Sequence, residues 1–143
     1  MGFRFATMLL AGSCLLMAAT GNAQPPAATG AVVDPDLLAF AGKLRSCTPA
    51  TATQPHPLMR GFSIEHAVTG LQDARCDYSQ GMPGNMRMVC AFDEAARAAY
   101  ADELERTATT GAMSGSSDGA QPAWASACEI EMASGKRVPF GKP

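Results

Sequence analysis

Alternating apolar and polar positions predict a three-stranded meander in the middle of the chain. In residues 62–69, one face carries Phe62, Ile64, His66 and Val68. Polar or small residues occupy the positions between them, as in a half-buried strand. Residues 74–79 and 86–92 alternate in the same way, and turn-forming residues at 70–73 and 81–85 separate the three segments. We therefore expect three antiparallel strands joined by two hairpins.

Helical spacing precedes this meander. Four apolar residues recur at intervals of three or four, namely Leu37, Phe40, Ala41 and Leu44. Asp34 suits the helix cap and Pro35 the first helical position. Pro49 disfavours the helical conformation of the residue before it, so the helix should end by Cys47. Residues 48–57 are expected to form a loop.

A second helix and a last strand follow the meander. Asp93 suits the cap of a helix over residues 94–106, which are rich in alanine and glutamate. Residues 124–132 alternate again and predict a final strand. The predicted fold class is therefore α+β: a small domain with an antiparallel β-meander of three or four strands packed with two helices. This architecture serves many unrelated functions.

The N-terminus has the pattern of a cleavable signal peptide over residues 1–23. Its apolar run, residues 6–19, is shorter than the roughly 20 residues of a membrane span. Small residues, Gly21 and Ala23, occupy the positions that precede cleavage. An alternative is lipoprotein anchoring at Cys14, but the apolar run continues past this cysteine. We expect a periplasmic or secreted product without a membrane span.

Export changes the interpretation of the cysteines. Removal of residues 1–23 leaves four of them, Cys47, Cys76, Cys90 and Cys128. An even number in an oxidising compartment predicts two disulfides. No two of the four have the C-x-x-C spacing of a redox site or zinc ribbon.

Four cysteines allow three pairings, and hairpin geometry favours one of them. If residues 81–85 form a symmetric loop, Cys76 lies directly opposite Cys90. Opposite residues of an antiparallel pair have β-carbons about 4.5–5.5 Å apart, near disulfide reach. The predicted bonds are therefore Cys76–Cys90 and, by elimination, Cys47–Cys128.

Two segments are too poor in large apolar residues to pack well. Residues 24–33 are rich in proline and alanine, and residues 107–121 are rich in glycine, serine and threonine. We expect a flexible N-terminal tail, then a single α+β domain over residues 34–143 that contains a flexible loop at 107–121. The remaining core is small, so disulfides should matter to its stability.

Charge and motifs narrow the function classes. The net charge of −2 becomes −3 when residues 1–23, which carry only Arg4, are removed, and this acidity disfavours a nucleic-acid partner. No nucleophile elbow, H-E-x-x-H zinc motif or phosphate-binding glycine loop is present. His66 lies in the apolar phase of its strand, which is typical of a hydrogen-bonded core histidine. We expect a protein that is not an enzyme.

Methionines offer one candidate metal site. Met82, Met86 and Met88 lie close together in sequence, and their thioether sulfurs are soft ligands that suit Cu(I). The competing interpretation is an ordinary core face, because Met86 and Met88 share their phase with Cys90. No other cofactor is expected.

The leading hypothesis is a non-catalytic exported protein that acts through protein contact, as an inhibitor or an auxiliary subunit of an envelope enzyme. Trp124, beside the flexible run, is a candidate anchor for the partner, although a large aromatic residue also commonly covers a small core. The alternatives are a periplasmic Cu(I) binder and a small-molecule or lipid binder with its site between helix and sheet.

Overall fold

A computed structural model describes residues 33–112 and 120–141 of the chain. The predicted signal peptide, residues 24–32 of the predicted tail and residues 113–119 lie outside these ranges. The described elements, in chain order, are α1 (Pro35–Arg45), β1 (Ala50–Pro55), β2 (Ser63–Gln72), β3 (Arg75–Met82), β4 (Met86–Phe92), α2 (Glu94–Thr110), the 3-10 helix η1 (Ala123–Ala127), β5 (Cys128–Glu131) and β6 (Arg137–Pro139).

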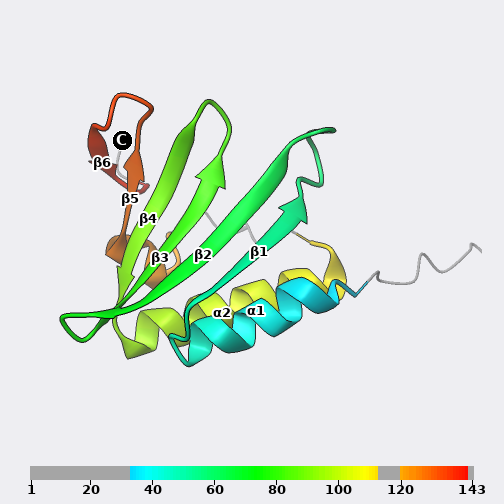
Figure 1. Cartoon of the computed structure of the whole chain (residues 1–143), viewed down its shortest axis with the longest axis horizontal. Coiled ribbons are helices and arrows are strands. Elements are labelled where there is room, and N and C mark those ends of the chain that lie inside the picture. Colours follow the sequence, from blue (N-terminus) through cyan, green and yellow to red (C-terminus); the bar gives the residue numbers. More distant parts are fainter. Residues whose placement is uncertain (1–32, 113–119, 142–143) are drawn as a thin grey trace, which may run out of the picture.

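The strands form one antiparallel sheet whose order, β1 to β6, follows the chain. Helices α1 and α2 lie side by side on one face of the sheet and cover one end of it (Figure 1). The predicted small α+β domain, with an antiparallel meander and two helices, is confirmed, although the sheet has six strands rather than three or four. Among the described residues, no helix is long and apolar enough to cross a membrane.

Both predicted helix starts are confirmed. The Asp34 carboxylate accepts hydrogen bonds from the backbone N–H groups of Asp36 and Leu37, at 3.1 and 3.0 Å. Asp93 caps α2 in the same way. Helix α2 continues to Thr110 rather than ending at residue 106, so residues 107–110 are helical instead of belonging to the predicted loop. This last turn is held because Ala108 is buried in the core.

Two strands were not predicted. β1 lies in the segment expected to be a loop, because alanine and threonine give no contrast between a buried and an exposed face. Pairing with β2 creates the strand there, which shows how tertiary context overrides weak local preference. β6 has only three residues. The expected last strand begins later than predicted, at Cys128, after the 3-10 helix η1 that contains Trp124.

The predicted register of the β3–β4 hairpin is wrong by two residues. β3 extends to Met82, which pairs directly with Met86, so the turn has three residues instead of five. Cys76 consequently lies opposite Phe92, and Cys90 lies opposite Tyr78. Because side chains alternate with a period of two, this shift keeps every residue on its predicted face.

Both predicted disulfide pairings are also wrong, although all four cysteines form disulfides. The bonds are Cys47–Cys76 and Cys90–Cys128. The second joins directly opposite residues of β4 and β5, where the Cα atoms are 4.1 Å apart. The first joins Cys47, two residues after the end of α1, to β3, and it therefore ties the helical layer to the sheet.

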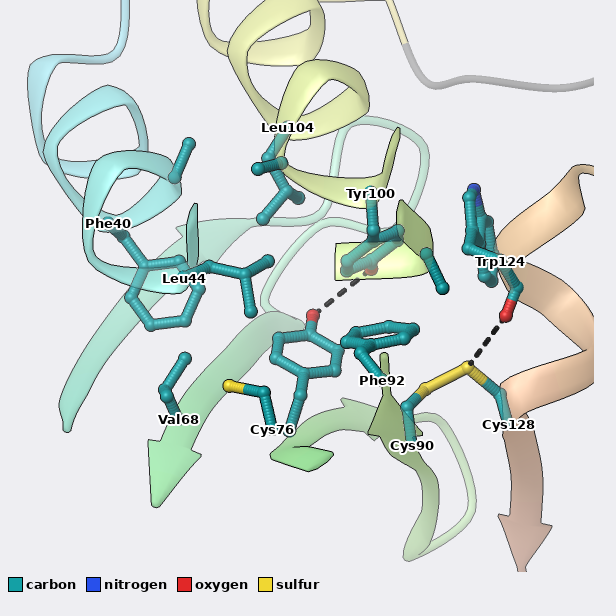
Figure 2. Close-up of a cluster of buried hydrophobic side chains, with 14 of the residues drawn as sticks. Phe40, Leu44, Val68, Cys76, Cys90, Phe92, Tyr100, Leu104, Trp124 and Cys128 are labelled. Carbon is teal, nitrogen blue, oxygen red and sulfur yellow. Dashed lines mark hydrogen bonds between the residues drawn. A yellow bond between two sulfur atoms is a disulfide. The ribbon is translucent and has the colours of Figure 1, made fainter. Parts of the chain in front are cut away.

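Aromatic rings fill the space between the helices and the sheet (Figure 2). The ring of Tyr78 packs on Phe92 and Tyr100, with centroids 5.7 and 5.0 Å apart. Tyr100 in turn meets Trp124 at 4.6 Å. These contacts run continuously from β3 through α2 to η1, so one aromatic cluster connects the sheet, the long helix and the C-terminal segment.

Removal of the disulfide between helix and sheet should destabilise the fold. The bond joins residues that are 29 apart in sequence. For a closed loop of this length, chain entropy predicts that removing the bond lowers the free energy of unfolding by about 3–4 kcal/mol. Urea denaturation of C47A/C76A, compared with the oxidised parent, measures this loss. Non-reducing peptide mapping checks the connectivity, and a Cys76–Cys90 peptide would contradict the register described above.

Candidate functional site

The free edge of β1 is the candidate functional site. β1 pairs only with β2 within the described residues. The His56 N–H donates to the Phe62 carbonyl at 2.9 Å and so fixes which residues face β2. Hydrogen-bonding groups alternate along an antiparallel strand, so Ala52 directs its backbone groups to β2 while Thr51 and Thr53 direct theirs to the open edge.

A groove of about 500 Å³ runs along this edge, between α1 and β1. The helix contributes Asp36, Ala39, Phe40 and Lys43, and the strand contributes Ala50, Thr51, Ala52 and Thr53. Apart from Asp36 and Lys43, the lining residues are apolar or small, and β1 itself carries no charged side chain. Asp36 and Lys43 place opposite charges about 10 Å apart along the helix axis, one toward each end of the groove.

The opposite edge of the sheet differs in ways that matter for strand pairing. β6 has three residues. Its hydrogen bonds to β5 are made by the residues on either side of Arg137 and Pro139, so the backbone groups of these two residues point away from β5. Charge, proline and short length all discourage another strand from pairing with an edge. β1 has six residues and lacks this protection until Pro55, so β1 is the edge open to strand addition.

A second hollow, of about 540 Å³, lies on the face of the sheet that the helices leave open. Several of its charged side chains have partners on the same face. Arg137 contacts Glu131 at 2.8 Å and approaches Glu129 at 4.0 Å, and Arg87 donates to the Ser79 hydroxyl at 2.8 Å. Arg137 and Arg87 therefore already have partners on this face, whereas β1 pairs with no strand on its outer side within the described residues. The β1 edge is for that reason the stronger candidate.

Trp124 does not provide the surface anchor expected of it. It is only 6% exposed, and its ring packs against Tyr100 and Phe140. The indole N–H donates to the Glu103 carboxylate at 2.7 Å. A tryptophan whose ring and polar group are both satisfied inside the fold is core, which corrects the hypothesis of a partner contact.

The three methionines predicted to bind Cu(I) lie on the helix-side face of β3 and β4. Met82 and Met86 are directly opposite each other and half-buried. Met88 is 4% exposed and belongs to the hydrophobic core, opposite Gln80. The structure therefore brings two of the three together at the end of the hairpin and places the third deeper in the fold.

His66 lies at one end of a buried polar network whose central member is Tyr78. The His66 Nδ1 atom lies 2.7 Å from the Tyr78 hydroxyl, which lies 3.1 Å from the Tyr100 hydroxyl. Tyr100 donates to the Gln80 side-chain carbonyl at 2.6 Å. The His66 Nε2 atom has no hydrogen-bond partner. Protonation on Nδ1 gives a consistent chain of donors from His66 through the tyrosines to Gln80, and leaves Nε2 as an unpaired acceptor.

Burial keeps this network uncharged. It lowers the pKa of His66 to about 4 from the usual 6.5, against a weaker opposing effect of the Asp34 charge. Burial likewise raises the pKa of Tyr78 and of Tyr100 well above 10. A neutral histidine with two protonated phenols supplies hydrogen bonds rather than a charged nucleophile or base, so the network acts as a specific core contact.

The other chemically reactive groups also have structural contacts. His56 Nδ1 accepts hydrogen bonds from the backbone N–H groups of Leu58 and Met59, at 3.1 and 3.0 Å, and holds the loop between β1 and β2. The cavity beside the tyrosine network, lined in part by Gln54 and Leu104, has a volume of about 70 Å³. Ordinary ligand sites enclose about 300–1,000 Å³, so this cavity does not favour the lipid-binding alternative.

The chain matches no protein-family model, and neither a curated protein nor a solved structure matches it. Its candidate site is therefore identified from its own geometry. Sequence reasoning missed Thr51 and Thr53 because they lay in a predicted loop. The signal that was present is the Ala-Thr-Ala-Thr alternation of residues 50–53, which has the period of a strand but little apolar contrast.

The buried histidine predicts a dependence of stability on pH. Between pH 6.5 and about 4 the unfolded chain binds a proton at His66 and the folded chain does not, so the free energy of unfolding falls as the pH decreases. The steepest contribution is about 1.4 kcal/mol per pH unit.

Urea denaturation across this pH range measures the slope, and H66Q is the comparison because glutamine does not titrate. The slope of H66Q should be smaller than that of the parent by this contribution. Equal slopes for the two proteins would contradict a buried neutral histidine.

Proposed function

We propose that this protein is a non-catalytic exported protein that binds a protein partner of the cell envelope by strand addition at β1, as an inhibitor or an auxiliary subunit. An extended segment of the partner pairs with the free edge and becomes a seventh strand of the sheet. Main-chain hydrogen bonds supply affinity in this mode of recognition, and the flanking groove supplies specificity.

The observation that carries this proposal is the outward direction of the backbone groups of Thr51 and Thr53 beside a preformed groove. A partner strand there receives two N–H donors and two carbonyl acceptors from these residues. Those side chains of the partner strand that point toward α1 pack over Ala39 and Phe40 and extend the core. Specific strand pairing of this kind needs an edge without charge, and β1 meets that condition.

Charge at the groove selects the orientation of the partner. Lys43 lies toward the start of β1, because α1 ends just before the strand begins and the two run in opposite directions. Asp36 lies toward the other end. A segment with an acidic residue near Lys43 and a basic residue near Asp36 is complementary to both.

Extracellular action is supported by the two disulfides, which are typical of exported proteins. In the periplasm or outside the cell, no reducing pool opens the Cys47–Cys76 bond that fixes α1 beside β1. The groove depends on that relative position, since α1 and β1 form its two walls.

Proline at the open edge should weaken the proposed complex. T53P removes an N–H that β2 does not use, so the fold should persist while the partner loses one hydrogen bond and meets the proline ring. We expect at least about tenfold weaker binding, the factor that corresponds to 1.4 kcal/mol. Affinity purification of the tagged mature protein from its native envelope, followed by quantitative binding with the recovered partner, measures the effect.

The matched control is R137P, which removes an outward N–H from β6 at the opposite edge. R137P should bind as the parent does, and equal melting temperatures show that both variants are folded. In the parent complex, the amide protons of Thr51 and Thr53 should gain protection from hydrogen exchange. Unaltered binding by T53P, or protection confined to the open sheet face, would refute strand addition at β1. A homodimer formed through β1 would replace the envelope partner with a second copy of this chain.

A further inference from the structure

A third methionine joins Met82 and Met86 at the end of the sheet. β4 and β5 pair with Arg87 opposite Glu131, and one further step in this register places Met132 opposite Met86. Met132 is still part of the sheet, because its N–H donates to the Lys136 carbonyl at 2.8 Å and continues the β5–β6 ladder. The three residues therefore lie in one row across β3, β4 and the end of β5.

All three side chains belong to the same face of the sheet. Met132 shares its phase with Ile130 and Cys128, which contact the core, and Met86 shares its phase with Cys90. Neighbouring residues on adjacent antiparallel strands have β-carbons about 4.5–5.5 Å apart. Rotation about the Cα–Cβ and Cβ–Cγ bonds of an unbranched methionine moves its sulfur, so the three thioether sulfurs have the reach to meet at one point.

This row lies where the helices do not cover the sheet. The β3–β4 turn and the β5–β6 turn are both at the end of the sheet remote from α1 and α2 (Figure 1). Met82 and Met86 are half-buried, and Met132 is 38% exposed. Each of the three residues is thus partly exposed, while the register of three strands fixes their positions relative to one another.

We propose that Met82, Met86 and Met132 form a three-thioether site for Cu(I). Thioethers are soft, neutral ligands, which favours a soft monovalent ion over Zn²⁺ or Ca²⁺. They need no deprotonation, so the site remains competent in an acidic exterior. In residues 33–112 and 120–141, no three His, Cys, Asp or Glu side chains cluster to hold a metal ion. The described part of the fold therefore offers no competing site of harder ligands.

Met132 replaces Met88 in the set of three methionines that was predicted from the sequence. Met88 lies two residues farther along β4, inside the core and paired with Gln80 and Ile130. Its neighbours on both adjacent strands carry no sulfur, whereas Met86 has a methionine on each side. The site is separate from the β1 edge, since β2 lies between β1 and β3, the nearest strand that carries one of the three methionines.

Titration of the disulfide-intact mature protein with Cu(I) tests this site. Cu(I) is maintained anaerobically with ascorbate, and competition with bicinchoninate reports the affinity. Ag(I), a redox-inert soft ion, is added to protein labelled with ¹³C at the methionine methyl groups. We expect one ion per chain and shifts of the Met82, Met86 and Met132 methyl signals.

Leucine substitutions separate the ligands from their apolar neighbours, because leucine keeps the hydrophobic surface and removes the sulfur. M82L, M86L and M132L should each weaken Cu(I) binding by at least the roughly 10–100-fold that loss of an outer-shell partner costs. M88L and M59L are the matched controls and should bind as the parent does. Failure of the parent to withdraw Cu(I) from bicinchoninate, or loss of binding in M88L but not in M132L, would overturn the assignment.

Discussion

The contact between α1 and the middle of the sheet, held by the Cys47–Cys76 disulfide, is the constraint on which the rest of the structure depends. The two helices cover only part of one sheet face, so the core between the helical layer and the sheet is small (Figure 1). The disulfide sits at the point where α1 ends and the chain turns toward β1. It fixes the helix, the first strand and the third strand relative to one another.

The polar network explains how so small a core selects one arrangement. Phe40 packs on both His66 and Tyr78, with ring centroids 5.6 and 6.4 Å away. The Tyr78 hydroxyl contacts both His66 and Tyr100, so the apolar face of α1 rests on the network that reaches α2. Apolar contact alone tolerates sliding of a helix over a sheet, whereas hydrogen bonds between fixed hydroxyls do not. Helix position and sheet register are therefore coupled through a few residues.

The sequence-based predictions succeed where polar and apolar residues contrast and fail where pairing decides. The faces of β2, β3 and β4 follow from alternation, and the helix caps follow from Asp34 and Asp93. Register does not follow, because a shift of two residues leaves the alternation unchanged. Because Cys76 was expected opposite Cys90, this ambiguity led to the wrong disulfide for Cys76 and, by elimination, to the wrong second disulfide. The relation between Met86 and Met132 could not be predicted for a separate reason, because it exists only through the pairing of β4 with β5.

The two proposed sites share a physical origin in the mismatch between a wide sheet and a short helical layer. Six strands need more cover than helices of 11 and 17 residues provide. At the β1 edge, the uncovered part is backbone, whose unpaired donors and acceptors are satisfied by water or by another strand. At the end of the sheet remote from the helices, side chains are left uncovered instead, and those in the row across β3, β4 and the end of β5 are methionines. A polar residue at those positions would suit water better, unless the thioethers serve a ligand or a partner. Incomplete cover in a disulfide-linked domain thus leaves two surfaces of different chemistry, a strand edge and a row of thioethers, for which we have proposed an extended peptide and a soft ion as ligands.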